Sequence, residues 1–367
     1  MAGGRPADRR AGVHPGRGDR AGRGRRCRGG VPGRTTGGGT LALPAMRFVV
    51  CGEALIDLAN VPEPSDSSFR STWQALSAGG PMNSAVALAR LERDVQFLGR
   101  MSTDRFGTQL RQHLEADGVG LDAVVTVDDP TAVAVVSLDA HGKASYAFHT
   151  ERTATFGWRP GELPALGADD WLHFGSMLLV VEPGASTFLE WVRDCPARMS
   201  VDLNVRSAVV ADPDEYWRRV EPYLAVVGRR GGVAKASDDD VLFLARAADA
   251  SADPSADPVA LVTAWVQRFG LGLFVLTLGP DGALAVLADG AVVRVRGHRV
   301  EVVDTVGAGD TFMAGFLAAW AGADGAPTET VRTALQQGAA ASAIVCGRQG
   351  AQPPTLAEVR AFLDAAG

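Results

Sequence analysis

The chain contains few cysteines and no long apolar run, and each of these absences excludes a class of protein. Only four of its 367 residues are cysteines, and no two of them have C-x-x-C spacing. This argues against a disulfide scaffold or a zinc module and favours reduced thiols in a cytoplasmic protein. No segment reaches the roughly 18 apolar residues of a membrane helix, and the Arg-rich start lacks the apolar core of a secretory signal. Neither a membrane partner nor secretion is therefore expected.

Positive charge is also scarce outside the first segment. The formal net charge is −6 at pH 7, but residues 1–45 carry ten Arg against Asp8 and Asp19. Because this segment contributes +8, the rest of the chain is near −14. An acidic body of this kind argues against a nucleic-acid-binding surface, so no nucleic-acid partner is expected.

Residues 1–45 differ from the rest of the chain in composition. They hold 13 Gly and 4 Pro with few apolar side chains, so packing them would not offset the entropy lost on ordering. We expect a disordered Gly/Arg-rich extension, followed by one domain over residues 46–367. An Arg/Gly arm that binds nucleic acid is an alternative. An over-extended translation start is another, because Met46 directly precedes the strand-like Phe48–Cys51.

Removal of residues 1–45 is expected to leave the melting temperature and the activity essentially unchanged, because this polar segment has no apolar face to dock. The two proteins are compared by thermal unfolding and by assay. A melting temperature several degrees lower in the shortened protein would show that the extension packs on the domain.

The remaining sequence alternates between β-rich runs and stretches of helical periodicity. This βαβα order predicts an α/β fold with a mostly parallel central sheet covered by helices on both faces. Ligands of such sheets bind beyond the carboxyl ends of the strands. The expected strands are Phe48–Cys51, Val95–Leu98, Trp171–Phe174, Met199–Asp202, Ala225–Val227 and Leu273–Thr277. The expected helices are Asn83–Leu91, Phe106–Asp117, Pro183–Cys195, Asp238–Arg246 and Pro258–Phe269.

Two further β-rich runs, Thr131–Asp139 and Lys143–His149, interrupt this alternation. They are joined by a predicted turn at 140–142, with Tyr146 and Phe148 on one face of the second run. Together with Leu58–Trp73 they predict a small β-structure that stands off the main sheet. Such a unit can be a flap over a ligand site or an ordinary surface hairpin, and the residues alone leave both interpretations open.

A glycine-rich turn near the C-terminal end is the clearest candidate for chemistry. Glu301–Val303 is predicted to be a strand, Asp304–Phe312 follows as the turn, and a helix is predicted over Met313–Ala321. Such a turn points backbone N–H groups and the positive end of a helix at an anion. Asp310 would lie where it can accept a proton from a hydroxyl. The alternative is a tight turn in which Asp310 only caps the helix.

Other routes to nucleotide or metal chemistry are missing from the sequence. The chain has no G-x-x-x-x-G-K-[ST] phosphate loop, and its one G-x-G-x-x-A, at Gly118–Ala123, follows a helical stretch rather than a strand. Six scattered histidines without an H-E-x-x-H pattern form no metal-ligand cluster, and there is no G-x-S-x-G nucleophile motif. Anion binding by backbone turns is what remains.

Several segments resemble those of a known family. Asp304–Phe312 is similar to the second signature of the ribokinase-like (PfkB) sugar kinases, and Gly79–Leu91 is similar to the first. The further matches, which extend the resemblance over residues 46–367, are Cys51–Leu58, Gly99–Gly107, Val201–Arg206, Lys235–Asp240 and Thr277–Ala283. The first of these is typical of the fructokinase-like branch. The resemblance implies a ribokinase-like three-layer α/β/α fold with a mostly parallel central sheet and a small β lid.

The same resemblance implies a catalytic centre. Asp310 would be the base that activates a sugar hydroxyl, and Arg206 would offset the charge of the transferring group. The anion hole for the γ-phosphate would be formed by the amides of Gly307, Ala308 and Gly309. The residues implied in sugar binding are Asp57, Gly79, Gly80, Asn83 and Asn204. Taken alone, Asp57 and Arg206 would more often be a cap and a solvated charge.

Nucleotide binding is implied at a second group of residues. ATP would be contacted by Ser237, Asp240, Thr277, Gly279 and Gly282, with Ala339–Cys346 as part of the adenine wall. The family commonly has Asn at the position of Ser237 and Glu at that of Asp240. Mg²⁺ would be held through the ATP phosphates, and a monovalent cation such as K⁺ is a further implied cofactor. The implied lid, residues 58–73 and 131–151, would exclude water from phosphoryl transfer and offer a surface for a homodimer.

The expected function is therefore an ATP-dependent carbohydrate kinase that phosphorylates a hydroxymethyl group, with fructose as the first choice of sugar. The 2-keto-3-deoxygluconate kinases tend to carry an Arg where this chain has His149 and Thr150. That sugar acid, ribose and nucleosides remain alternatives. The rivals from other classes are a catalytically silent sugar-binding protein on the same scaffold and a nicotinamide dehydrogenase. The dehydrogenase would need a glycine fingerprint where Gly52–Ala54 follows the first strand.

Overall fold

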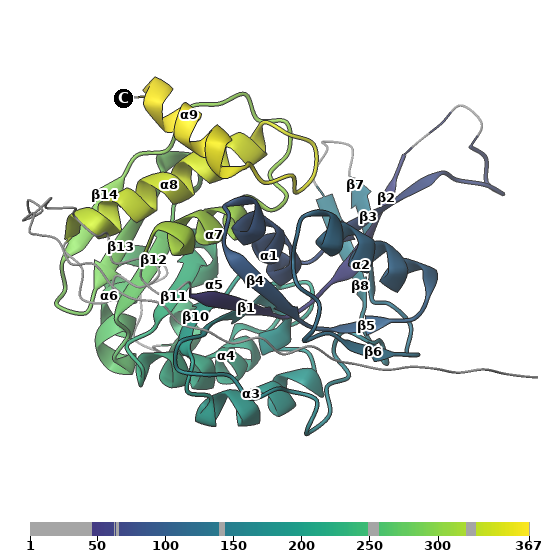
Figure 1. The fold of residues 1–367 in the computed structure, drawn as a ribbon, viewed down its shortest axis with the longest axis horizontal. Coiled ribbons are helices and arrows are strands. Elements are labelled where there is room, and N and C mark those ends of the chain that lie inside the picture. The colour runs from purple at the N-terminus through teal and green to yellow at the C-terminus, as the bar shows by residue number, and fades with distance from the viewer. Residues whose placement is uncertain are drawn as a thin grey trace, which may run out of the picture. The chain divides into compact units, whose positions relative to one another are not determined.

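The structure, a computed structural model, describes residues 46–61, 63, 66–138, 144–248, 257–320 and 328–366. The extension predicted for residues 1–45 and the turn predicted at 140–142 lie outside the described residues. Figure 1 shows how the described elements are arranged along the chain.

An eight-stranded sheet forms the centre of the described chain, in the order β14-β13-β12-β11-β10-β9-β1-β4. From β12 through β11, β10, β9 and β1 to β4, each strand is parallel to the next. The pairs β12–β13 and β13–β14 are antiparallel. The strands are β1 (Arg47–Cys51), β4 (Asp94–Leu98), β9 (Trp171–Gly175), β10 (Arg198–Asp202), β11 (Val233–Ser237), β12 (Leu273–Thr277), β13 (Ala283–Leu287) and β14 (Val292–Val295). The inner strands are largely buried, as expected for a parallel sheet covered on both faces.

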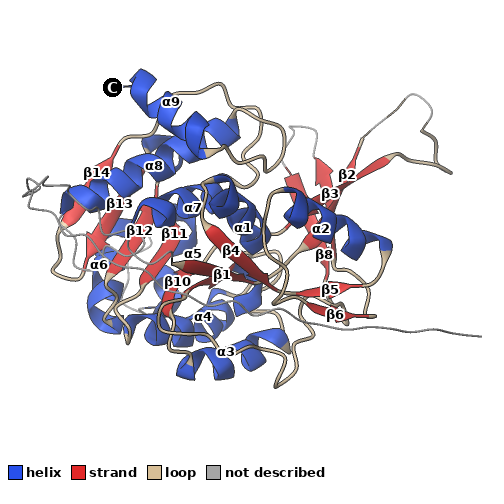
Figure 2. Ribbon diagram, viewed as in Figure 1, coloured by secondary structure: helices blue, strands red, loops and turns tan. Residues whose placement is uncertain are grey.

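Helices cover both faces of this sheet (Figure 2). One face carries α1 (Gly80–Arg90), α2 (Arg105–Ala116), α7 (Ala308–Trp320), α8 (Thr328–Cys346) and α9 (Leu356–Ala366), and the other carries α3 (Gly184–Asp194), α4 (Pro213–Gly228), α5 (Asp238–Ala248) and α6 (Pro258–Phe269). Side chains alternate along a strand. Phe48 and Val50 of β1 therefore pack in the core beneath the first group of helices, and Val49 and Cys51 pack in the core beneath the second group. The predicted three-layer α/β/α fold is confirmed.

A second sheet of four strands stands apart from the main one (Figure 1). Its order is β3-β2-β7-β8, with β2 (Leu55–Asn60), β3 (Trp73–Ala78), β7 (Val133–Leu138) and β8 (Ala144–His149). The predicted small β-structure is thus present, but β2 begins before residue 58 and β3 continues to residue 78. A short two-stranded sheet, β5 (Arg100–Ser102) and β6 (Val125–Val127), connects to α2.

The strand predicted at Ala225–Val227 is wrong, because these residues form the end of α4. A run of three apolar residues cannot be told from a buried stretch of helix by periodicity alone. In the structure, Val220 and Leu224 are buried one helical turn apart and hold α4 on the core. The next strand of the sheet is β11, and residues 229–232 connect the end of α4 at Gly228 to β11.

The strand predicted at Glu301–Val303 is also wrong. Val303 donates its N–H to the carbonyl of Cys346 in α8 (2.8 Å) rather than to a strand, and Val302 and Val303 are 60% and 59% exposed. β-branched residues favour a strand only where a neighbouring strand can pair with them. The helix that follows, α7, begins at Ala308 instead of Met313, because part of the glycine-rich turn is itself helical.

Within the described ranges, no helix combines the length and the apolarity needed to cross a membrane. Cys51 and Cys195 are buried free thiols, and Cys346 is a half-buried one; Cys27 lies outside the described residues.

Candidate active site

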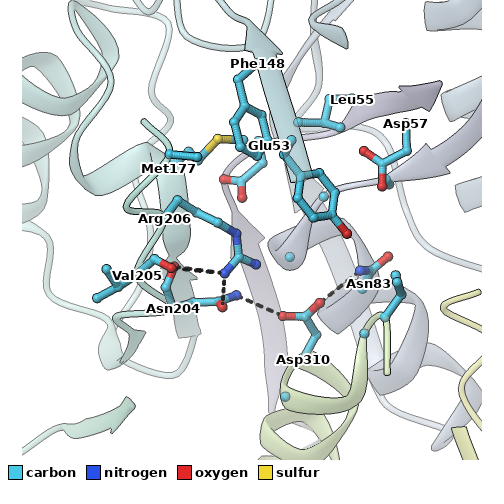
Figure 3. Close-up of a pocket in the computed structure, with 18 of the residues that line it drawn as sticks. Glu53, Leu55, Asp57, Asn83, Phe148, Met177, Asn204, Val205, Arg206 and Asp310 are labelled. Carbon is cyan, nitrogen blue, oxygen red and sulfur yellow. Dashed lines mark hydrogen bonds between the residues drawn. The ribbon is translucent and has the colours of Figure 1, made fainter. Parts of the chain in front are cut away.

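A cavity of about 450 Å³ opens at the carboxyl ends of the central strands. Its wall comes from the turn after β1, the segments after β9 and β10, the start of α1, the turn before α7, and the small sheet (Figure 3). The cavity brings together every residue predicted to act in catalysis or sugar binding: Asp57, Gly79, Gly80, Asn83, Asn204, Arg206, Gly307, Ala308, Gly309 and Asp310.

Asp310 lies in the first turn of α7 and is held by two side-chain amides. It is 6% exposed, and its carboxylate accepts hydrogen bonds from Asn83 Nδ2 (2.9 Å) and Asn204 Nδ2 (3.2 Å), as Figure 3 shows. Asn83 belongs to α1 and Asn204 follows β10, so two distant parts of the sequence fix one carboxylate. Among the described residues no backbone N–H of α7 donates to it, which leaves the capping interpretation without support.

The backbone beside Asp310 explains why Asn stands at position 204 and Gly at position 80. Asn204 has a φ of +36°, a left-handed conformation that Asn tolerates better than most residues. A Cβ on Gly80 would lie 3.0 Å from Asn204 Nδ2 and 3.1 Å from Asp310 Oδ1. Any larger residue at position 80 would therefore displace the carboxylate or the amide that holds it.

The electrostatic surroundings of Asp310 suit a base. Burial raises the pKa of its carboxyl above the usual value, and the negative charge of Asp202 acts in the same direction. The hydrogen bond from Asn83 and the positive charges of Arg206 and Lys235 oppose this rise. A carboxylate with a raised pKa binds a proton more strongly, which is what proton abstraction from a hydroxyl requires.

Two helix N-termini meet at the cavity. α1 begins at Gly80 and α7 at Ala308, and the two helices pack against each other. Ala308 donates its N–H to Thr305 (3.2 Å), while the N–H groups of Gly307 and Gly309 have no protein acceptor among the described residues. Unpaired N–H groups at the positive end of a helix favour an anion. The turn therefore offers N–H groups to an anion chiefly at its two glycines, and the binding of a phosphate there stays a prediction.

Arg206 is the one basic side chain among the described residues that line the cavity. Its Nη1 donates to Asn204 Oδ1 (2.6 Å), so the guanidinium also fixes the amide that binds Asp310 (Figure 3). Its backbone N–H donates to the Tyr216 hydroxyl (3.0 Å), which ties the segment to α4. A guanidinium at this place can offset the charge of a phosphoryl group.

The small sheet supplies a carboxylate and an aromatic surface. Asp57 lies in β2, and burial raises the pKa of its carboxyl to about 6, while Arg206 acts to lower it. Tyr146 and Phe148 of β8 line the cavity together, with ring centroids 5.8 Å apart and planes at 11°. The prediction that both rings share one face of this strand is confirmed. Apolar walls with a few placed polar groups are typical of small-molecule sites.

The predicted nucleotide-binding residues lie outside this cavity, at neighbouring strand ends. Ser237 and Thr277 end β11 and β12 and are paired in register. Gly279 begins the 3₁₀ turn η2 (Gly279–Asp281), and Gly282 follows it. These four residues share the carboxyl edge of the sheet with the cavity, and their contact with a nucleotide stays a prediction.

Asp240 binds the main chain of the protein itself. Its Oδ2 accepts the N–H of Ser237 (2.9 Å), and Ser237 Oγ accepts the N–H of Asp240 (3.1 Å). This reciprocal pair is a capping box at the start of α5. Its Oδ1 accepts the N–H of Val205 (3.0 Å). Asp240 therefore fixes the corner between β11 and α5 beside the Arg206 segment, and its role toward ATP stays a prediction.

The predicted adenine wall, Ala339–Cys346, is the C-terminal part of α8. Its alanines and Val345 are buried in the core. Only the half-buried Ser342, Ile344 and Cys346 remain available to a ligand, which narrows the prediction to one side of the helix.

Glu53 and Met177 line the cavity but were not predicted as site residues. Glu53 follows β1 and is 1% exposed, and burial raises the pKa of its carboxyl. Met177 lies in the 3₁₀ turn η1 (Ser176–Leu179) directly after β9. Both come just after the carboxyl end of a predicted strand, where ligands of such sheets bind. Their position alone would therefore have identified them, although no sequence motif contains Met177.

Residues 46–358 match the pfkB family carbohydrate kinases. The chain belongs to this family. In this PfkB kinase the first signature contributes Gly80 and Asn83 and the second contributes Gly307 and Asp310, so the two signatures meet at one cavity.

The similar proteins include fructokinases. The fructokinase of Rhizobium leguminosarum bv. trifolii is 34% identical over 275 residues, which cover 74% of this chain and 78% of that protein. The structure of a Xylella fastidiosa fructokinase with bound ATP has a TM-score of 0.75 and 27% identity, covering 87% of this PfkB kinase and 98% of that chain. The fructokinase of Vibrio cholerae O395 with fructose, ADP and a calcium ion has a TM-score of 0.73 and 26% identity, covering 87% and 99%. The predicted family and ribokinase-like fold are confirmed.

Proposed function

We propose that this PfkB kinase transfers the γ-phosphate of ATP to the hydroxymethyl group of fructose. One observation carries the proposal: the buried Asp310 carboxylate faces the same cavity as the glycine turn of α7 and the Arg206 guanidinium. A base, an anion site and a cation within one cavity are the parts that phosphoryl transfer needs. The similar structures that contain fructose with ADP, or ATP, support the same pair of substrates.

In the proposed reaction the hydroxymethyl oxygen attacks the γ-phosphorus in line. Its O–H bond breaks and the proton goes to Asp310, while the bond between phosphorus and the bridging oxygen breaks and ADP leaves with that electron pair. The N–H groups of Gly307 and Gly309 and the charge of Arg206 stabilise the transferring group. Asn83 keeps the carboxylate in place through its 2.9 Å hydrogen bond.

Mg²⁺ is proposed to bind with ATP rather than in a protein cage. In the part of the chain that the structure describes, no three His, Cys, Asp or Glu residues are grouped to hold a metal. This fits Mg²⁺, which is commonly bound through substrate phosphates and keeps several waters. When bound, the ion would neutralise charge on the phosphates. A dependence on K⁺ stays a prediction, measured by comparing rates with and without potassium salts.

The charge of the cavity favours a neutral sugar. Glu53, Asp57 and Asp310 are the acidic residues that line it, and Arg206 is the one basic residue among the described lining. The carboxylate of 2-keto-3-deoxygluconate would have to compete with the phosphoryl group for a single guanidinium and would face three carboxyl groups. A neutral ketohexose meets neither difficulty.

The small sheet is proposed to be the lid, with Asp57 on its cavity side. The edge strand β3 exposes Leu76 (45%), which pairs with Asp57 and shares its face, and Trp73 (40%) on the opposite face. Phe69 (97% exposed) lies in the loop between β2 and β3. Apolar side chains on an exposed sheet edge favour pairing with a second copy, so a homodimer through the lid is proposed. Sedimentation equilibrium measures its mass, and a monomer at micromolar concentration would contradict the homodimer.

A substrate panel tests the proposed function. Formation of phosphorylated product is measured with ATP and fructose, ribose, 2-keto-3-deoxygluconate or adenosine, and fructose is expected to give the highest kcat/KM. A higher value for another acceptor would reassign the substrate. Sugar binding without product from any of the four would show a silent sugar-binding protein instead of a kinase.

We expect the KM for fructose to rise as the pH falls through about 6, because the Asp57 carboxyl then takes up a proton. An ionised carboxylate accepts a stronger hydrogen bond from a hydroxyl than a neutral carboxyl does. In the Asp57→Asn variant, the KM for fructose is expected to be roughly tenfold higher at neutral pH and to be independent of pH in this range. The KM for ATP, measured in the same series, should not change. A pH-dependent KM that persists in the variant would assign the titration to another group.

A further inference from the structure

A buried ion pair lies behind the glycine turn. Lys235 Nζ is 2.7 Å from Asp202 Oδ2, and the two side chains are 4% and 6% exposed. Asp202 is the last residue of β10 and pairs in register with Lys235, the middle residue of the adjacent strand β11. Lys235 is also the one charged residue in β11, which is otherwise built of Val, Ala and Ser. Neither residue has a part in the reaction described above.

The pair approaches the catalytic centre on two sides. A Cβ on Gly309 would lie 3.3 Å from Lys235 Nζ, which places the ammonium directly behind the turn whose N–H groups form the anion site. Asp202 lines a second cavity, of about 10 Å³, which Asp310 and Asn204 also line. Asp202 Oδ1 is buried there and accepts no hydrogen bond from a described residue. The ammonium therefore borders the phosphate side of the site and the carboxylate borders the base.

Stability alone does not explain such a pair. The cost of removing two charges from water is about as large as their attraction, and apolar residues of similar volume are often equally stable. Charges buried at low dielectric act strongly on neighbouring charges, however. A lysine whose ammonium lies directly behind the glycine turn is therefore placed where its charge acts on an anion bound at that turn.

We propose that Lys235 and Asp202 are positioning residues for phosphoryl transfer: the Lys235 ammonium supplies positive charge behind the turn of Gly307 and Gly309, and Asp202 holds the ammonium there. The inference rests on the proposed function, because it requires the phosphoryl group to bind at this turn. The positive charge stabilises the charge that develops during transfer. Lys235 also offsets the negative charge of Asp202 beside the base.

The double variant Asp202→Asn/Lys235→Met tests this inference without leaving an unpaired buried charge. We expect it to fold with a melting temperature within a few degrees of wild type, and to keep the KM for fructose within about threefold. The kcat is expected to fall by about 10- to 100-fold, somewhat less than the loss of a direct donor to the transition state. A folded double variant with a kcat within about threefold of wild type would overturn the inference.

The pH profile of the single variants gives a readout that a merely structural role would not move. The charged groups around Asp310 are Asp202 on β10, Lys235 on β11, Arg206 after β10 and Glu53 after β1. Because Asp310 must be ionised to act, activity falls as the pH drops through its pKa. Asp202→Asn removes a negative charge and should move this acidic limb of kcat/KM to lower pH. Lys235→Met removes a positive charge and should move the limb to higher pH.

If the double variant does not fold, the pH profile of Asp202→Asn tests the inference instead. This substitution keeps the shape of the side chain and an acceptor for Lys235. An acidic limb at the wild-type position would then overturn the inference.

The matched control is Asp170→Asn/Arg47→Met, which removes an ion pair (2.9 Å) at the opposite end of the same sheet and should leave kcat unchanged. Wild-type protein that phosphorylates no sugar would refute the proposed function. An active wild type with an unaffected double variant would refute only this inference.

Discussion

The Asp310→Asn variant is expected to fold, to bind ATP and fructose, and to turn over roughly 10²- to 10⁴-fold more slowly, the usual contribution of a positioned general base. The new amide has nearly the shape of the carboxylate but cannot accept the hydroxyl proton at neutral pH. The Asn204 amide cannot rotate, because its Oδ1 accepts a 2.6 Å hydrogen bond from Arg206. The Asn83 amide can rotate by about 180°, so that its oxygen accepts a hydrogen bond from the new NH₂ group. The geometry is kept while the chemistry is removed.

The melting temperature of this variant is an independent check. Because burial raises the pKa of Asp310, its ionised form costs folding free energy at neutral pH, and this cost disappears as the pH falls below that pKa. Asp310→Asn is therefore expected to melt at the wild-type temperature or above it. Product formation and a binding titration are measured on the same preparation. Turnover within about threefold of wild type would leave Asp310 with a structural role only.

Local sequence patterns predicted the α/β class of the fold and the glycine-rich turn, and the family resemblance predicted the other residues at the centre of the site. The strands at Val95–Leu98 and Leu273–Thr277 are apolar runs between helical stretches, and the structure has them as β4 and β12. The glycine-rich turn before α7 was identified as a candidate site because glycines and an acidic residue at a helix start form a short pattern with a defined geometry. Asp310 and Asn83 are 227 residues apart, yet both were predicted: Asp310 from this pattern, and Asn83 from the resemblance of Gly79–Leu91 to the first signature of the family.

Features that depend on packing between distant elements were missed or misassigned. Glu301–Val303 has strand-forming residues but no partner strand, and only the fold decides whether a partner is present. Lys235 and Asp202 belong to predicted family segments, but no local pattern shows that they form a buried pair 2.7 Å apart. Their pairing follows from the parallel register of β10 and β11, which is set by the whole sheet.

The Gly307→Ala variant is expected to lose about 10²- to 10³-fold in kcat, the range found when a preorganised donor to the transition state is lost. Gly307 has a φ of +76°, and its new Cβ would lie 2.7 Å from the Cβ of Ala351 and 3.6 Å from Asn83 Nδ2. The turn must therefore shift, and the N–H group of Gly309 shifts with it. The amide of Asn83, which holds Asp310, lies beside the same methyl group.

A matched variant separates this effect from the backbone cost of the substitution. Gly290 has a φ of +85° in the connection between β13 and β14, and a Cβ there would meet no atom within 4 Å. Gly290→Ala therefore carries the same backbone penalty, about 1–2 kcal/mol, without disturbing the anion site. Thermal unfolding and kcat are measured for both variants. If Gly307→Ala lost no more kcat than Gly290→Ala, the turn would not be the phosphate site. A large difference in kcat at similar melting temperatures would locate the effect in the position of the N–H groups, because the backbone penalty is common to both variants.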